Sequence, residues 1–256
     1  MGASAKTFLR LIDLKQRGLI GVGTRMVELG SQNISQTSGE GLRSFISEFR
    51  DEPCSVDSAE LERIAGGGTM ASLMKLCGVD YLALDIFEAE DCMLFDLNTD
   101  SVPENLRGQF DLVTNFGTSE HIIDQYRTFM TVHEFTKSGG LIYHDLPMGG
   151  YFYHGYFSYT PLFFNHLALA NRYDVLFQWF SKVPIAAPLV QQATAELTEG
   201  GWPDTGYHDV GIEYIFRKTT DAPFRVPVDV GTSVALNREF VEGKRSDAVI
   251  LRLPES

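Results

Sequence analysis

The segment Arg25-Met26-Val27-Glu28-Leu29-Gly30-Ser31 decides the fold. A short apolar run that carries one carboxylate leads directly into a glycine, which is typical of a buried strand ending in a tight turn. A long, mostly helical pattern follows it. A buried strand followed by a helix predicts the first unit of a parallel α/β sheet, because parallel neighbours need a crossover connection.

Further short apolar segments follow this first strand. We expect strands at residues 81–85, 92–97, 110–115, 141–144, 174–180 and 212–216. The spacing of apolar residues predicts helices at 6–17, 42–49, 59–76 with a break at 66–68, 122–135, 161–171 and around 189–197. Strands that alternate with helices predict a doubly wound α/β sheet with helical insertions.

We interpret the 256 residues as one domain, residues 1–256, with an N-terminal helix in 1–24. From Gly30 to Asp85 the chain runs 55 residues, whereas about 20 separate the glycine turn from the ribose-binding acid in a plain βαβ unit. Residues 31–78 are therefore predicted to be a helical insertion that could act as a lid. A second candidate lid is 181–210, and 221–256 forms a C-terminal extension.

The chain is acidic, with 21 Lys and Arg against 34 Asp and Glu and a formal net charge of −13. Phosphate backbones and anionic lipids repel such a surface, so we expect neither nucleic acid nor a membrane as partner. A small-molecule acceptor fits better. The sequence leaves the oligomeric state open, with a homodimer as one option.

Cysteine usage and hydropathy bear on the compartment. The three cysteines, Cys54, Cys77 and Cys92, are odd in number and form no Cys-x-x-Cys pair, so no disulfide framework or zinc knuckle is expected. No signal peptide and no apolar run of membrane-spanning length is recognisable. We expect a cytoplasmic protein.

Ligands of open α/β sheets bind beyond the carboxyl ends of the strands. An ordered set of residues occupies these positions, and we predict that it binds the cofactor. Its members are Glu28, Gly30, Ser31 and Gln32 after the first strand, Asp85 and Ile86 after the second, Asp96 and Leu97 after the third, and Asn115, Phe116 and Gly117 after the fourth.

The charge of this set discriminates between two cofactor classes. A dinucleotide needs a Gly-x-Gly-x-x-Gly turn, but only Gly30 occupies the turn here. Glu28 would also repel a pyrophosphate. S-adenosylmethionine carries a sulfonium and an ammonium and no phosphate, so the acidic residues would attract it. Asp85 can accept both ribose hydroxyls, and Asp96 can accept the adenine amino group.

Six segments in this order resemble the class I S-adenosylmethionine-dependent methyltransferases over about residues 25–216. They are Val27-Glu28-Leu29-Gly30-Ser31, Leu84-Asp85, Phe95-Asp96-Leu97-Asn98, Phe110-Asp111-Leu112-Val113, Ser119-Glu120-His121-Ile122 and Lys137-Ser138-Gly139-Gly140-Leu141. The resemblance implies a seven-stranded, mostly parallel sheet in the order 3-2-1-4-5-7-6 with the last strand antiparallel. It also implies S-adenosylmethionine as cofactor, with His121 among the residues that contact it. The turn departs from the family pattern, since Ser31-Gln32-Asn33 stand where many relatives have further glycines.

An aromatic segment with two histidines, residues 143–159, follows the fifth strand. About half of its rings are expected to pack as core. The others can wall a pocket for a small acceptor. We assign substrate binding to Tyr143, Tyr153, Tyr156 and Phe157. A hydroxyl acceptor needs a base, and histidine has a suitable pKa; we rank His154 first and His144 second.

A metal is the weaker alternative. Some methyltransferases of small RNA 3′ ends and of quinone precursors bind a divalent ion with Glu-x-x-Glu-His after the fourth strand. Glu120 and His121 match the last two residues, but Gly117 replaces the first glutamate. His144 or His154 could complete such a site. Because one ligand is missing, the sequence prediction is an enzyme without a metal.

The sequence therefore predicts methyl transfer from S-adenosylmethionine to an oxygen or nitrogen atom of a small metabolite. One alternative is an oxidoreductase or epimerase with a nucleotide cofactor on a related sheet. Another is a non-catalytic partner subunit that binds S-adenosylmethionine.

Overall fold

The computed structural model describes all residues except 1–2, 4, 36, 152–153, 184–208 and 230–256. A seven-stranded sheet with the order β3-β2-β1-β4-β5-β7-β6 runs through the described part of the chain. Its strands are β1 Arg25–Leu29, β2 Asp80–Asp85, β3 Cys92–Leu94, β4 Phe110–Phe116, β5 Thr136–Gly149, β6 Tyr173–Val183 and β7 Asp209–Lys218. The neighbours from β3 to β5 are parallel, and β7 is antiparallel to both β5 and β6. The expected fold class is confirmed.

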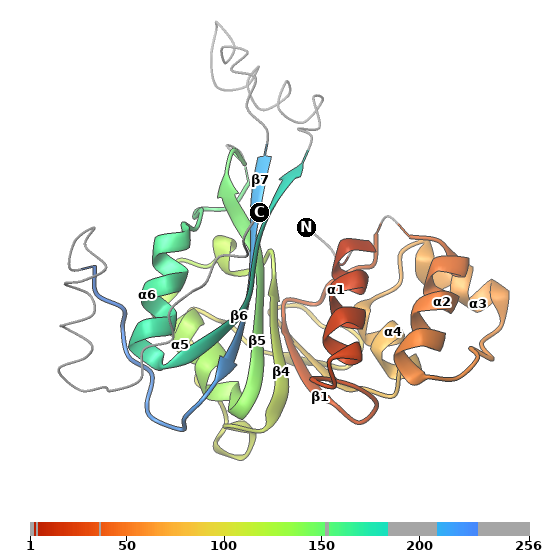
Figure 1. Cartoon of the computed structure of the whole chain (residues 1–256), viewed down its shortest axis with the longest axis horizontal. Helices are drawn as coiled ribbons and strands as arrows, with labels where there is room; N and C mark the ends of the chain where they lie inside the picture. The colour runs from red at the N-terminus through yellow and green to blue at the C-terminus, as the bar shows by residue number, and fades with distance from the viewer. Residues whose placement is uncertain (1–2, 4, 36, 152–153, 184–208, 230–256) are drawn as a thin grey trace, which may run out of the picture.

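Helices cover both faces of the sheet, as Figure 1 shows. One face carries α1 Ala5–Gln16, α2 Gly39–Arg50, α3 Ser58–Ala65 and α4 Met70–Leu76, and the other carries α5 Gln125–Phe135 and α6 Pro161–Asn171. Two short 3-10 turns, Glu104–Leu106 and Ser119–His121, lie in the connections on either side of β4. None of the helices in the described ranges has the length and apolar character needed to cross a bilayer.

The apolar core forms two clusters, one on each face of the sheet. Alternation along β1 sends Met26 to the cluster under α1–α4, and Val27 and Leu29 to the cluster under α5 and α6. Glu28 alternates to the same side as Met26, so a carboxylate enters the core beneath α1–α4. This burial determines the protonation state of Glu28.

The predicted insertion at 31–78 is a layer of the core. Leu42, Phe45 and Ile46 of α2 belong to the same cluster as Met26 of β1. The break expected in the helix at 59–76 is confirmed: α3 ends at Ala65, and a Cβ at Gly68 would lie 2.8 Å from the Ile64 Cα. A role for this layer as a lid stays a prediction. The other candidate lid and most of the C-terminal extension lie outside the described residues, as does the helix expected near 189–197.

Strands β6 and β7 are a few residues longer than predicted, and the larger differences from the sequence prediction are in β3 and β5. β3 ends at Leu94 rather than at 97, because the Asp96 carboxylate accepts the Asn98 backbone N–H at 2.8 Å and turns the chain. β5 runs from Thr136 to Gly149, well beyond the expected 141–144. Its added residues pair with β4 at one end and with β7 at the other. These strand pairings form only in the assembled sheet.

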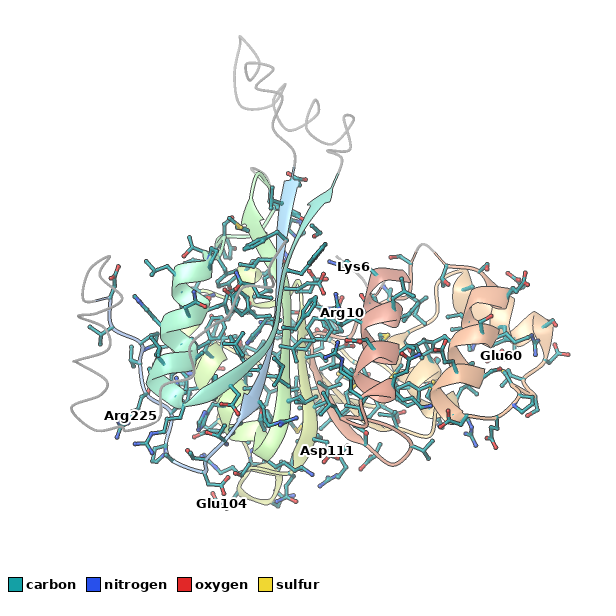
Figure 2. All side chains as sticks on the ribbon, in the orientation of Figure 1. Lys6, Arg10, Glu60, Glu104, Asp111 and Arg225 are labelled. Carbon is teal, nitrogen blue, oxygen red and sulfur yellow. The ribbon has the colours of Figure 1, made fainter. Side chains whose placement is uncertain are left out.

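Helix α1 is attached to the sheet through charged groups on β5 and β7. Glu213 is fully buried, and its carboxylate oxygens lie 3.2 Å from the Lys6 Nζ and 3.6 Å from the Arg10 Nε. The Tyr143 hydroxyl donates to it at 2.8 Å, and Lys6 also pairs with Asp145 at 2.8 Å. Figure 2 shows Lys6 and Arg10 on the side of α1 that faces the sheet. These contacts fix α1 over the carboxyl end of β5.

We expect Lys6→Met to lower the free energy of unfolding by about 2 kcal/mol, because it leaves the buried Glu213 short of one cation. Lys15→Met on the same helix is the matched control, since Lys15 pairs with the exposed Asp51 and a surface pair contributes about 0–1 kcal/mol. Urea denaturation measures both values. Equal losses in the two variants would contradict the importance of the buried cluster.

Candidate active site

The turn after β1 requires glycine. Gly30 has φ +74°, and a Cβ there would lie 2.6 Å from the Thr118 Oγ1. The Thr118 hydroxyl donates to the Leu29 carbonyl oxygen at 2.6 Å and accepts the Gln32 side-chain amide at 3.2 Å. The turns that follow β1 and β4 are therefore in direct contact at the carboxyl edge of the sheet.

Asp85 ends β2 at the same edge. The Ser31 N–H donates to its Oδ2 at 2.8 Å, and the Phe87 N–H donates to its Oδ1 at 3.1 Å. Each carboxylate oxygen keeps a lone pair for a ligand hydroxyl. The side chains of Ile86 and Phe87 are 61% and 73% exposed beside it. A carboxylate next to two exposed apolar side chains is suited to a ribose that carries a flat base.

The residues after β3 complete this side of the edge. Asp96 is half-buried and Leu97 is buried. The Asn98 backbone N–H lowers the pKa of Asp96, so this carboxylate stays ionised at neutral pH. The Asn98 side-chain oxygen accepts two N–H groups, from Ile123 and Asp124, at 3.1 Å each. It thereby joins this loop to the start of α5.

Glu28 is fully buried rather than displayed at the edge. The Tyr81 hydroxyl donates to its carboxyl group, and the Gln32 N–H approaches it at 3.4 Å. Burial raises the pKa of Glu28 to about 8, so it is mostly protonated at neutral pH. The negative charge expected from Glu28 is therefore supplied at this edge by Asp85 and Asp96, while Glu28 supports the turn from beneath.

The protonation of Glu28 predicts a pH dependence of stability. The folded-state pKa is about 8 and the ordinary value is 4.5, so the native state holds a proton that the unfolded chain releases. The stabilisation that comes from this bound proton is fully present below pH 4.5 and is lost as the pH rises toward 8. Between pH 5.5 and 8 we expect wild type to lose roughly 3 kcal/mol more than Glu28→Gln.

Urea unfolding of the two proteins at several pH values measures this difference. Burial also raises the pKa of Asp145, to about 6. Comparing the variant with wild type therefore separates the contribution of Glu28 to the pH dependence of stability from that of Asp145. Parallel stability curves for the two proteins would mean that Glu28 is ionised in the native state.

The residues from the end of β4 to Glu120 shape the turn and are buried, except Thr118, which is half-buried. The Asn115 amide donates to the Ser119 Oγ at 2.9 Å, and its oxygen accepts the Ser119 N–H at 3.1 Å. Phe116 is buried and packs edge-to-face on Tyr143. Gly117 is buried with φ +71°, and its N–H donates to the Asp145 carbonyl oxygen at 3.1 Å.

The structure corrects two expectations about the aromatic segment, because β5 extends past both residues. His144 is enclosed by Phe129, Phe164 and Phe216, and burial lowers its pKa to about 3, so it cannot meet an acceptor as a base. Tyr143 is equally buried, with its hydroxyl on Glu213, and cannot wall a pocket.

The other aromatic residues predicted to bind substrate differ in their exposure. Tyr156 is 69% exposed, and Phe157 is half-buried against the core under α5 and α6. Tyr153 lies outside the described residues.

Glu120, His121 and His154 come together at the same edge. The Glu120 Oε1 lies 3.5 Å from the His154 Nε2 and 3.9 Å from the His121 Nε2. Glu120 is fully buried, and both imidazoles are partly exposed. Burial lowers the pKa of His121, although the charge of Glu120 acts in the opposite direction. Of the two predicted bases, His154 is the one with access to solvent.

The loop that carries His154 is fixed on Glu120. The N–H groups of Tyr156 and Phe157 donate to the Glu120 carbonyl oxygen at 2.6 and 3.2 Å. A Cβ at Gly155 would lie 2.7 Å from the Glu120 Cγ, so only glycine permits this approach. The sequence paired Glu120 with His121 and left open whether His144 or His154 would complete a metal site with them. The structure brings His154, and the glycine that follows His154 in the sequence is what permits the approach.

The comparison with known families decides the identity. A family model described as a methyltransferase domain matches residues 40–186, which is more than half of the chain. The chain belongs to this methyltransferase family. With the class I strand order, this makes the protein an S-adenosylmethionine-dependent methyltransferase. No curated protein matches the sequence.

Solved structures give more distant similarities to this methyltransferase. One is the 1,6-didemethyltoxoflavin-N1-methyltransferase of Burkholderia thailandensis, with 12% identity, a TM-score of 0.44, and coverage of 83% of this chain and 78% of that one. Another is phosphoethanolamine N-methyltransferase 2 of Haemonchus contortus, with 12% identity, a TM-score of 0.43, and coverage of 83% and 52%. Values this low carry no information about the acceptor.

The edge residues of the methyltransferase fit its cofactor, S-adenosylmethionine. At the left-handed turn, Gly30 has no side chain, so a ligand can approach the backbone closely. The carboxylates of Asp85 and Asp96 suit a ligand that is cationic and has no phosphate. A pyrophosphate would meet these carboxylates instead of a glycine-rich cradle.

We expect Gly30→Ala to weaken binding of S-adenosylhomocysteine at least tenfold in calorimetry, because the new methyl group would displace Thr118 from the turn. Gly23→Ala is the matched control. Gly23 also has a positive φ, +81°, but no atom lies within 4 Å of a Cβ there. Both variants incur backbone strain of about 1–2 kcal/mol. Equal affinities in the two variants would mean that the turn does not contact the cofactor.

Proposed function

We propose that this methyltransferase transfers a methyl group to an oxygen or nitrogen atom of a small-molecule metabolite, of the kind made in biosynthetic or natural-product pathways. The observation that carries the proposal is the position of His154 and Glu120 beside the cofactor turn. Thr118, which contacts Gly30, is only two residues from Glu120. Two residues span at most about 7 Å, so one small molecule can reach from the turn to the histidine.

The cofactor site in this proposal follows the carboxyl edge of the sheet. Asp85 binds the ribose hydroxyls, and Ile86 and Leu97 flank the adenine. Asp96 receives the adenine amino group. The backbone from Gly30 to Gln32 and at Gly117 lies along the methionine part. Three further residues support this site: Glu28 and Asn115 from within the sheet, and Phe116 beneath the turn. His121 lies between the cofactor and the acceptor.

S-adenosylmethionine supplies a methyl group that its sulfonium already activates. The chain therefore has to align the acceptor, exclude water and accept a proton where the acceptor is a hydroxyl. The His154 Nε2 is buried, faces the Glu120 carboxylate at 3.5 Å and has no hydrogen-bond partner in the described part of the chain. In the tautomer with its proton on Nε2, the other ring nitrogen, Nδ1, receives the acceptor's proton, and Glu120 stabilises the imidazolium that results. Tyr156 and Phe157 flank the acceptor on the same loop.

The charge of the chain favours a small acceptor over a nucleic acid. A net charge of −13 repels a phosphate backbone, and no Lys/Arg run longer than a pair occurs in the sequence to offset that repulsion locally. A small neutral or cationic metabolite meets no such repulsion. The acidic surface therefore supports the choice of a small acceptor.

Calorimetric titration with S-adenosylhomocysteine and NAD, side by side, tests the cofactor class. We expect binding of S-adenosylhomocysteine only. Tight binding of NAD without S-adenosylhomocysteine would support the oxidoreductase alternative and contradict the proposal.

Asp85→Ala should weaken S-adenosylhomocysteine binding more than tenfold, and Asp85→Asn should weaken it less, because the amide keeps one acceptor oxygen. Asp80→Ala is the matched control on the same strand, since Asp80 lies at the opposite end of β2 and pairs with Arg25 at 3.0 Å. Calorimetry compares the four proteins. An unchanged dissociation constant in Asp85→Ala would place the ribose elsewhere.

A further inference from the structure

Glu120 is a buried carboxylate without a counter-charge among the described residues. Its side chain is fully buried, and neither oxygen has a hydrogen-bond partner in that part of the chain. No described lysine or arginine pairs with it, in contrast to Glu213, which has two cationic neighbours. An isolated buried carboxylate is strongly unfavourable, so buried charges are normally paired or coordinate a metal.

The two neighbouring imidazoles stand at the separations that metal ligands have. The distances of 3.5 and 3.9 Å from the Glu120 Oε1 exceed the 2.7–2.9 Å of a charged hydrogen bond. Oxygen and nitrogen ligands about 2.0–2.2 Å from one tetrahedral ion lie roughly 3.4 Å apart. One ligand atom from each of Glu120, His121 and His154 can be chosen so that all three lie within 4.8 Å of one another.

The backbone holds this cluster in place before any ligand arrives. Glu120 and His121 are consecutive residues of one 3-10 turn, and His154 reaches them because the loop after β5 is bonded to the Glu120 carbonyl oxygen. Gly155 allows the loop to approach. A preformed cluster loses little conformational entropy on binding.

We propose that Glu120, His121 and His154 bind one divalent transition-metal ion, such as Zn²⁺, and leave at least one coordination position open. Two imidazoles and one carboxylate are ligands that Zn²⁺ accepts, whereas Mg²⁺ and Ca²⁺ prefer oxygen alone. Three protein ligands with an open position are characteristic of catalytic rather than structural metal sites.

The role of the metal rests on the proposed function. The open position takes the hydroxyl oxygen of the acceptor, and the ion lowers the pKa of that hydroxyl, so its proton leaves to water. The oxygen then forms a bond to the methyl carbon, and the electron pair of the carbon–sulfur bond stays on sulfur. The products are the methylated acceptor, S-adenosylhomocysteine and one proton, with no change of oxidation state at the metal. His154 is then a ligand, and the acceptor is a compound whose hydroxyl oxygen can bind a metal.

Titration of Zn²⁺ into the metal-free, tag-free full chain tests the site directly. We expect one ion per chain, with binding weakened roughly 100-fold or more in Glu120→Gln and in His154→Ala. Glu104→Gln is the control, since Glu104 is 94% exposed and lies at the other end of the sheet from Lys6 in Figure 2. Wild-type binding that neither site variant changes would overturn the proposal, as would the absence of stoichiometric binding.

Thermal unfolding adds a readout that does not depend on activity. Without metal, Glu120→Gln should unfold at the same or a higher temperature than wild type, because it removes an unpaired buried charge. Zn²⁺ should raise the unfolding temperature of wild type and leave that of the variant unchanged. A metal-free variant that is less stable than wild type, with no response of wild type to Zn²⁺, would identify Glu120 as a structural residue only.

Binding of S-adenosylhomocysteine separates this inference from the proposed function. If S-adenosylhomocysteine binds and Zn²⁺ does not, the metal site is wrong and His154 remains the candidate base. If Zn²⁺ binds and S-adenosylhomocysteine does not, the metal site stands and the proposed function fails.

Discussion

The hydrogen bond from the Thr118 hydroxyl to the Leu29 carbonyl oxygen joins the two turns on which the site depends. β1 and β4 are parallel neighbours, so their carboxyl ends arrive at the same edge of the sheet. The bond draws the segment after β4 against Gly30, and the chain then reaches Glu120 two residues later. The proposed cofactor turn and the candidate acceptor site are thereby held within the length of one small molecule.

Three fully buried glutamates lie at or near this edge, and the protein accommodates each in a different way. Glu28 takes up a proton and is hydrogen-bonded by Tyr81. Glu213 forms ion pairs with Lys6 and Arg10, which attach α1 to the sheet. Glu120 has no such partner in the described part of the chain, which distinguishes it as a residue that a ligand would complete.

The fold was largely predictable because its signals are local. Apolar runs ending in Gly30 or Asp85 mark strands, and the strand order follows from the family resemblance that these runs support. The ends of β3 and β5 were not predictable, since they depend on a side-chain turn at Asp96 and on pairing with β7. The misplaced roles of Tyr143 and His144 follow from that second boundary, because both residues lie in the middle of the longer strand.

The sequence by itself determined a doubly wound sheet with a glycine turn and acidic strand ends, because backbone periodicity and turn chemistry act over a few residues. Only the tertiary structure decided which acids face solvent and which are buried, because burial depends on the layers packed over each strand. It also brought His154 to Glu120, 34 positions away in the sequence. That contact depends on the path of a loop and on the missing side chain of Gly155, and no local pattern in the sequence encodes the path.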